Sequence, residues 1–435
     1  MSSKMRSSCR NRVAVHRLFI CLCFLNHSIA EYQTHHLYHL PIVNASLQLE
    51  MEACGDFGPS AWSSRQPGSP QSLQVPALPR ALWGTAYAQR RIWEHQHPYS
   101  CRSHKLAYYS SLDNGHGIGS TLHLMGHALG IAMALGRVFI MGPELSVWGR
   151  GKHCEGMRTL DECYFLPLSS CTYDDILDRG QATPYKSSEH TRLGAAVDAS
   201  PEAVHFRHFK DMGNSHNVSQ MFTNDMIRML KSSPIPQQWW FYWWRCQASA
   251  YIVRPNRRTL VAIEHARNLT LSVADRHALS SGSWVSVYMR RGDKAKERPL
   301  MLTDPQPFLD LATRMLNSHP GKVSPRILLA TEDVDVHRYF ITQSVVPVYA
   351  TNVTRFPANT SYSPMDHAQR IGPHVEFINA LLSLELSFSG NGFVMAMTSN
   401  WGRLINEMRS TIQCKAHYPF VDPEQPHGIT KLDWR

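Results

Sequence analysis

The chain has 435 residues, a length at which two packed units are expected rather than a single hydrophobic core. Hydrophobic residues make up 43% of the sequence and charged residues 18%, a composition that excludes disorder along the whole chain. The net charge is +10, but no run of Lys and Arg with interleaved aromatic residues occurs, so the excess suits an anionic small molecule at least as well as nucleic acid.

Residues 1–30 have the pattern of a targeting segment. Basic residues at the start of the chain precede a short apolar run, Leu18–Leu25. This run has the length of a signal-peptide core and is too short to span a bilayer comfortably. Ser28-Ile29-Ala30 resembles a cleavage site, and the alternative is a retained signal anchor. Both alternatives place the chain in the secretory pathway.

Cysteines and glycosylation sequons agree with a lumenal chain. The cysteines beyond Ala30 are Cys54, Cys101, Cys154, Cys163, Cys171, Cys246 and Cys414. In an oxidising compartment some of them should pair, and the cluster from 154 to 171 is where we expect this first. Their number is odd, so at least one is free or bridges two chains, and their spacing matches no zinc site. Asn-x-Ser/Thr sequons begin at Asn44, Asn217, Asn268, Asn352 and Asn359.

Residues 31–91 are expected to form a stem or linker, because positions 55 to 80 are rich in Pro, Ser, Gly and Gln. The first folded half, residues 92–260, should start with a strand over Leu106–Ser110 that runs into Asn114-Gly-His-Gly-Ile-Gly119. A helix over Ser120–Leu135 and a strand over Arg137–Met141 follow. This order of strand, glycine loop, helix and strand is typical of a doubly wound α/β sheet.

An aromatic helix is predicted over Pro236–Arg254, since prolines punctuate both of its ends. Trp240, Trp244, Gln247 and Tyr251 share one face of this helix. We favour a core or interdomain helix over a platform on which a sugar would stack.

The second half, residues 261–435, alternates strands and helices more regularly. Strands are predicted over Trp284–Met289, Arg326–Ala330, Val345–Ala350 and Gly392–Met397. Helices are predicted over Phe308–Leu316, His374–Phe388 and Ser399–Ile412. Such alternation implies a mostly parallel, Rossmann-like sheet.

Polar residues follow three of these strands, where ligands of open α/β sheets bind. The segments are Arg290-Arg291-Gly292-Asp293-Lys294, Thr331-Glu332-Asp333 and Thr398-Ser399-Asn400. They supply guanidinium groups for a diphosphate, carboxylates for a base or ribose, and amides at a helix start. The loop with Gly115, Gly117 and Gly119 could bring its backbone close to phosphates from the other half. Together these segments predict a nucleotide site.

The same segments resemble the motifs of the α-1,6-fucosyltransferases. Tyr288-Met-Arg-Arg-Gly-Asp-Lys294 is similar to the family's His-x-Arg-Arg-x-Asp-Lys, and Leu329-Ala-Thr-Glu-Asp333 to its Ala-Thr-Asp-Asp. Val394-Met-Ala-Met-Thr-Ser-Asn-Trp-Gly-Arg403 resembles its strand leading to Ser-Ser-Gln and an Arg-containing helix. The glycine loop matches the family's Gly-x-Gly-x-Gly. The resemblance extends patchily from Tyr108 to Ile412.

This resemblance implies a GT-B-like α/β fold of two Rossmann-like halves, the first on the acceptor side, with the donor site in the cleft between them. It implies GDP-fucose as the donor, inversion at the anomeric carbon, and neither metal nor other cofactor. An N-glycan or a chitin-like oligosaccharide containing GlcNAc is the implied acceptor, and the Golgi lumen is the implied location.

The resemblance also implies roles for single residues. Arg290, with Arg291 beside it, would neutralise the β-phosphate, while Ser399 and Asn400 would bind the diphosphate. Glu297 would take the proton of the acceptor hydroxyl, and Asp293 and Lys294 would polarise or position it. Glu332, Asp333 and Glu385 would contribute to donor binding, with Glu385 as an acceptor for the guanine.

Simpler interpretations stand beside these roles. Asp333 and Ser399 could each only cap the helix that follows. Arg290 could pair with Asp293, and Glu297 could be a solvated surface residue. Tyr288 replaces the family's histidine, which leaves open how the guanine or phosphate is held there.

Three other functions remain open from the sequence. Asp333-Val-Asp335 is formally the DxD signature of metal-dependent GT-A transferases. The glycine loop could belong to a dinucleotide-dependent oxidoreductase, although its pattern is G-x-G-x-G. A protein of the same fold could also bind a nucleotide sugar without catalysing transfer.

Overall fold

The computed structural model describes residues 51, 80–110, 116–143, 147–149, 151–180, 182–184, 202–207, 221–291, 304–356 and 364–424. The targeting segment and most of the predicted stem lie outside these residues, as do Gly115, Asp293, Lys294 and Glu297. Within the described part of the chain, no helix is both long enough and apolar enough to cross a membrane.

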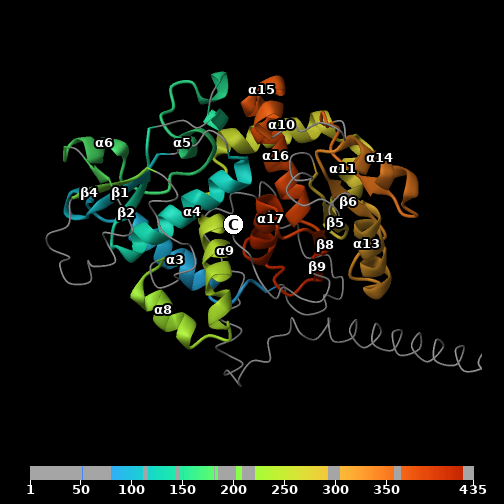
Figure 1. The fold of residues 1–435 in the computed structure, drawn as a ribbon, viewed down its shortest axis with the longest axis horizontal. Helices are drawn as coiled ribbons and strands as arrows, with labels where there is room; N and C mark the ends of the chain where they lie inside the picture. Colours follow the sequence, from blue (N-terminus) through green and yellow to red (C-terminus); the bar gives the residue numbers. More distant parts are fainter. Residues whose placement is uncertain are drawn as a thin grey trace, which may run out of the picture.

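A four-stranded parallel sheet forms the centre of the first half (Figure 1). Its order is β2-β1-β4-β3, and the strands are β1 (Leu106–Tyr109), β2 (Val138–Met141), β3 (Thr183–Pro184) and β4 (Ala203–Phe206). Helix α4 (Ile118–Ala134) connects β1 to β2, as the sequence predicts. Shorter helices of this half are α5 (Leu160–Tyr164), α6 (Tyr173–Leu177) and α8 (Asn224–Lys231).

The folded region begins earlier than the expected boundary at residue 92. Helix α3 (Thr85–Gln96) starts inside the predicted stem, and Ala81 and Ala88 are fully buried. The backbone N–H of Leu82 donates to the carbonyl oxygen of Ser410, 2.7 Å away. Helix α3 therefore starts inside the range expected for the stem, and the segment before it is bonded to the last residue of α17 (Asn400–Ser410).

A five-stranded parallel sheet forms the centre of the second half. Its strands are β5 (Val285–Tyr288), β6 (Ile327–Ala330), β7 (Val348–Tyr349), β8 (Gly392–Met395) and β9 (Phe420–Val421). The order β7-β6-β5-β8-β9 is 3-2-1-4-5 in chain order, so the strand order reverses between β5 and β8. Ligands of open α/β sheets bind beyond the carboxyl ends of the strands at such a switch point. The structure is thus an α/β protein with two parallel sheets, as predicted.

Helices surround the second sheet and connect its strands. They are α10 (Arg257–Thr270), α11 (Val273–Ala278), α13 (Gln306–Ser318), α14 (Val334–Gln343), α15 (Pro364–Ile371), α16 (Pro373–Phe388) and α17 (Asn400–Ser410). Helix α13 packs on β5 and β8, and α16 packs on β5 and β6.

Three helices join the two halves. The aromatic helix α9 (Trp240–Ile252) packs against α4 of its own half and against α17 of the other, and Figure 1 shows α4, α9 and α17 in the middle of the molecule. Trp243 and Trp244 are fully buried, and their indole N–H groups donate to the carbonyl oxygens of Trp83 and Gly126. The interpretation as a core and interdomain helix is confirmed.

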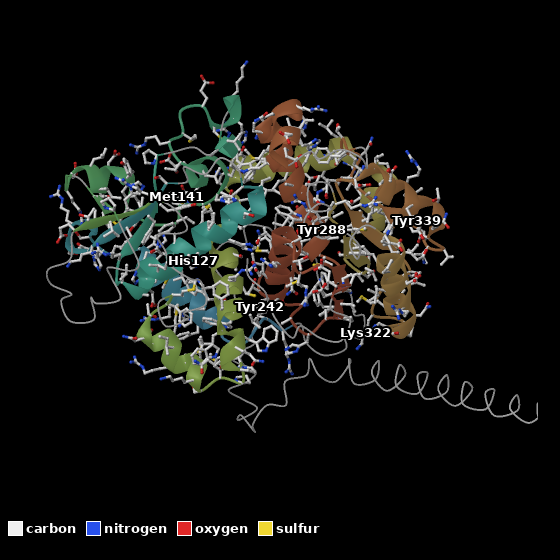
Figure 2. The ribbon with its side chains drawn as sticks, viewed as in Figure 1. His127, Met141, Tyr242, Tyr288, Lys322 and Tyr339 are labelled. Carbon is white, nitrogen blue, oxygen red and sulfur yellow. A yellow bond between two sulfur atoms is a disulfide. The ribbon has the colours of Figure 1, made fainter. Side chains whose placement is uncertain are left out.

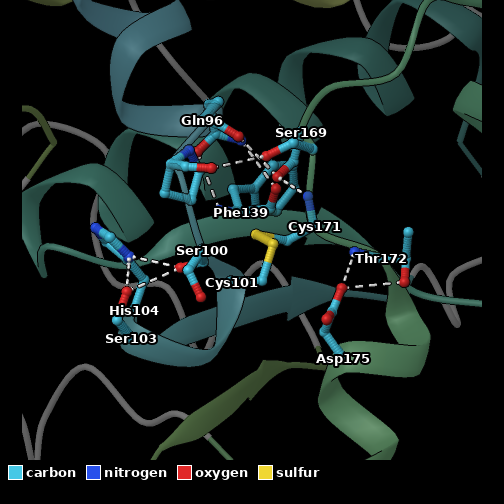
Figure 3. Close-up of a disulfide and its surroundings, with 12 residues drawn as sticks. Gln96, Ser100, Cys101, Ser103, His104, Phe139, Ser169, Cys171, Thr172 and Asp175 are labelled. Carbon is cyan, nitrogen blue, oxygen red and sulfur yellow. Dashed lines mark hydrogen bonds between the residues drawn. A yellow bond between two sulfur atoms is a disulfide. The ribbon is translucent and has the colours of Figure 1, made fainter.

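Two disulfides stabilise the first half. Cys154 pairs with Cys163, inside the expected cluster, whereas Cys171 pairs with Cys101 seventy positions away. Figure 3 shows the second bridge beside the Gln96 side chain, whose amide donates to the carbonyl oxygen of Phe139 at 2.8 Å. Cys414 is also disulfide-bonded, and Cys246 is a buried free thiol.

Candidate nucleotide site at the switch point

Strand β5 ends at the candidate site with Tyr288, Arg290 and Arg291. The Tyr288 hydroxyl accepts a hydrogen bond from the Ser399 hydroxyl at 3.3 Å, which links the ends of β5 and β8 (Figure 2 labels Tyr288). Burial, together with the nearby charge of Glu332, raises the pKa of Tyr288. Tyr288 is therefore a neutral hydrogen-bonding group inside the candidate site.

Arg290 contacts Glu332 at the end of β6 as well as Tyr288 of its own strand. Its Nε atom is 3.9 Å from Glu332 Oε1, and the same carboxylate oxygen accepts from the backbone N–H of Arg291 at 2.7 Å. Burial raises the pKa of Glu332, and the charge of Arg290 opposes that rise only in part. The carboxylate at the end of β6 thus holds the loop that carries both arginines.

Asp333 caps helix α14. Its Oδ1 atom accepts from the backbone N–H groups of Asp335 and Val336 at 2.8 and 2.9 Å, while Oδ2 lies 3.5 Å from Arg291 Nη1. The simpler interpretation of Asp333 as a helix cap is confirmed. Asp335, the second acid of the DxD triplet, pairs with Arg338 at the surface, so both carboxylates of the triplet have partners within the chain. Among the described residues, no group of three or more His, Cys, Asp or Glu could hold a metal ion.

Helix α17 begins at the carboxyl end of β8 with Ser399 as its N-cap. The Ser399 hydroxyl accepts from the backbone N–H of Trp401 at 3.3 Å. The amide nitrogen of Asn400 donates to the Ser120 hydroxyl of the first half at 2.7 Å. The first turn of α17 therefore lies between the glycine loop and the end of β5, where its amino end favours an anion.

The glycine loop meets this turn directly. Gly117 precedes α4, and Gly119 is the second residue of that helix. A Cβ atom added to Gly119 would lie 3.2 Å from the backbone of Asn400 and Trp401. A side chain at Gly119 would therefore crowd the close contact between the amino ends of α4 and α17.

Glu385 is the one described candidate that lies away from the others. It sits in the last turn of α16, which leads through Gly390 to the amino end of β8. Its carboxylate pairs with Arg267 of α10 at 2.5 Å. Because α16 runs antiparallel to the strands, its end lies at the sheet edge opposite Tyr288, and the structure does not bring Glu385 to the site.

Two acidic residues near the switch point were not predicted from the sequence. Asp422 follows β9, is 1% exposed, and has its pKa raised by burial to about 6. Glu424 accepts from the backbone N–H of Thr398 at 3.3 Å. Strand β9 has only two residues, so its end gave no pattern in the sequence.

Comparison with known proteins gives only distant similarities. No family model matches the chain, and neither does any curated protein. A crystal structure of NodZ α-1,6-fucosyltransferase soaked with GDP-fucose is similar at 13% identity and a TM-score of 0.37, over 70% of this chain and 92% of that one. A crystal structure of POFUT1 in complex with GDP-fucose is similar at 12% identity and a TM-score of 0.40, over 74% and 99% of the two chains.

A mutant of FUT1 from Arabidopsis thaliana in complex with GDP is similar at 11% identity and a TM-score of 0.38, over 74% of this chain and 73% of that one. At such identities and TM-scores the function has to be argued from the residues of the chain itself.

Proposed function

We propose that this protein is a glycosyltransferase that transfers fucose from GDP-fucose to a glycan, with inversion at the anomeric carbon. The observation that carries the proposal is the convergence of Arg290, Ser399 and Asn400 at the switch point of a 3-2-1-4-5 sheet. A guanidinium group, a hydroxyl and a helix amino end in one place form a site for a diphosphate. The order and spacing of the fucosyltransferase-like motifs specify the rest of the donor.

In the proposed reaction the acceptor hydroxyl loses its proton to Glu297 as its oxygen forms the new bond to the anomeric carbon. The bond from that carbon to the β-phosphate oxygen breaks, and GDP leaves with the electron pair. Arg290, Ser399 and Asn400 stabilise the charge that develops on the departing diphosphate. Lys294 and Asp293 would position the base.

The proposed acceptor is an N-glycan or a chitin-like oligosaccharide that contains GlcNAc, and the proposed location is the secretory pathway, with the Golgi lumen preferred. The two disulfides support an oxidising compartment. The N-terminal segment would serve as a signal peptide or as an anchor.

A second candidate function is binding of the nucleotide sugar without transfer. The contact of Arg290 with Glu332 favours it, because the carboxylate already offsets part of the charge intended for the diphosphate. This alternative predicts that GDP-fucose binds and that GDP is never released.

The experiment is a transfer assay with the purified lumenal region, with chitin oligosaccharides and truncated N-glycans as acceptors and EDTA present. GDP-fucose and other nucleotide sugars are supplied separately, and both GDP release and labelled product are measured. Transfer from GDP-fucose alone supports the proposal. Transfer that stops in EDTA would contradict its metal independence, and binding without release would favour the second function.

Replacement of the proposed base tests the chemistry separately from donor binding. Glu297→Gln keeps the size of the side chain but removes the proton acceptor, so turnover should fall by ~10²–10⁴-fold while GDP-fucose affinity changes little. An unchanged rate would assign the base to another carboxylate, with Asp293 next.

A further inference from the structure

A buried polar cluster lies between the two halves, directly behind the first turn of α17. Glu407 of α17 is fully buried and pairs with Arg245 of α9. Its other oxygen accepts from the Ser249 hydroxyl at 2.6 Å and lies 3.0 Å from Nε2 of His123 on α4. One carboxylate of the second half is thus held by three side chains of the first half.

The His123 ring faces different groups with its two nitrogens. Nδ1 lies 3.0 Å from the amide oxygen of Asn400, and Nε2 lies 2.9 Å from Arg245 Nη2. Burial and the charge of Arg245 lower the pKa of His123, which favours a neutral ring. Nε2 also lies 3.0 Å from Glu407 Oε2, so it faces both a donor and an acceptor and does not by itself fix the proton of the ring. Nδ1 faces the Asn400 amide oxygen, which only accepts, and this contact requires a proton on Nδ1.

This proton fixes the orientation of the Asn400 side chain. The amide oxygen of Asn400 receives hydrogen bonds from His123 Nδ1 and from Arg403 Nη1, the latter at 3.1 Å. With its oxygen held by two donors, the amide must direct its NH₂ group to the other side, where Ser120 accepts. An amide has two N–H groups, and among the described residues Ser120 is the acceptor that the structure shows for this nitrogen.

We propose that His123 is a positioning residue for the donor: its Nδ1–H group, with Arg403, holds the Asn400 carboxamide so that its second N–H points to the donor diphosphate. The role depends on the proposed function, because a diphosphate is the group that an N–H at the start of α17 would bind. His123 acts through Asn400 and does not touch the substrate itself.

The protonation of His123 can be measured without any ligand. In protein labelled with ¹⁵N-histidine, the signals that disappear in His123→Asn belong to this ring. We expect Nδ1 to carry a proton near pH 7, because it faces the Asn400 amide oxygen. A proton on Nε2 alone would leave no donor for Asn400 and would overturn the inference.

The effect on the donor is measured by calorimetry with GDP and with GDP-fucose. His123→Leu and His123→Asn both remove the contacts of Nε2 with Arg245 and Glu407, but the asparagine amide can still donate at the position of Nδ1. His123→Leu should weaken donor binding about tenfold, as expected for loss of a correctly oriented hydrogen bond to a charged group, and His123→Asn should recover most of that loss. His95→Leu is the matched control, because His95 bonds the carbonyl oxygen of Arg137 at the amino edge of the other sheet.

A double-mutant cycle with Asn400→Ala separates positioning from general stability. If His123 acts through Asn400, His123→Leu should weaken binding no further once Asn400 is alanine. Additive losses, or equal losses in the leucine and asparagine variants, would overturn the role. Failure of the wild-type protein to bind either nucleotide would overturn the proposed function instead, and the NMR measurement would still decide whether His123 donates to Asn400.

Discussion

The pKa values of buried carboxyl groups are shifted in opposite directions in two polar centres of this protein. In the interface centre, formed by His123, Arg245 and Glu407, burial would raise the pKa of Glu407, but the charge of Arg245 and the hydrogen bonds around it hold the pKa below its usual value. The strand-end centre is formed by Glu332 after β6 and Asp422 after β9. Burial raises the pKa of both carboxyl groups there, and no partner reverses the effect.

The difference supports a structural role for the first centre and the proposed functional role for the second. In the interface centre a buried carboxylate is paired with an arginine across the two halves, and the cost of burying its charge is offset within the protein. Buried carboxyls whose ionised form is disfavoured cluster at sites where a ligand or a reaction makes use of them. The contrast supports the proposed site at the ends of β5, β6, β8 and β9 and the proposed positioning role of the interface centre.

The largest effect on stability is expected from breaking the interface centre. Glu407→Gln removes the partner of Arg245 and leaves its buried guanidinium uncompensated, so the free energy of unfolding should fall by ~3–5 kcal/mol. Chemical denaturation measures this. Asp174→Asn breaks the exposed pair with Arg158 and should change the stability far less. Equal effects of the two variants would contradict the comparison.

A pH-dependent effect of intermediate size is expected from Asp422 in the strand-end centre. Its pKa is about 6 in the folded protein, well above the ordinary value of an aspartate, so the folded state holds this proton more tightly than the unfolded state does. Its contribution to stability is complete below about pH 4 and is lost as the pH rises to about 6, by roughly 2–3 kcal/mol. The difference between the wild-type and Asp422→Asn stability curves should show this slope, and parallel curves would refute it.

The smallest effect is expected at the cap of α14. Asp333→Ala should cost about 1 kcal/mol of stability, and Asp333→Ser, which keeps an oxygen for the helix amides, should recover most of it. Because the Asp333 oxygens already face two amides and Arg291, GDP binding should be nearly unchanged in the serine variant. A large loss of GDP affinity in that variant would show that Asp333 contacts the nucleotide.

Much of the second half could be predicted from its sequence. Apolar runs of four to six residues, each followed by polar ones, identify β5, β6 and β8, and a parallel sheet brings their carboxyl ends to one edge. Arg290, Glu332, Ser399 and Asn400 could be placed together for that reason. Glu385 could not be excluded, because the direction of α16 relative to the sheet becomes clear only once the strand order is known.

The interface centre could not be predicted. His123 lies 277 positions from Asn400 and 284 from Glu407, and a single histidine on an apolar helix carries no periodic signal. The early start of the fold was missed for a similar reason, since the segment around Leu82 is ordered by Ser410, at the far end of the chain. Short strands such as β9, with two residues, are below the length at which a pattern is visible.

The most direct test of the central claim is calorimetric titration of GDP-fucose into the wild-type protein and into Arg290→Ala, with Arg326→Ala as the control. Arg326 precedes β6, at the edge of the same sheet opposite Arg290, and bonds the carbonyl oxygen of Ala278. Binding by the wild-type and control proteins, with loss of binding and transfer in a folded Arg290→Ala variant, is the result that we predict. Near-normal binding and turnover by Arg290→Ala would contradict a donor site at the switch point.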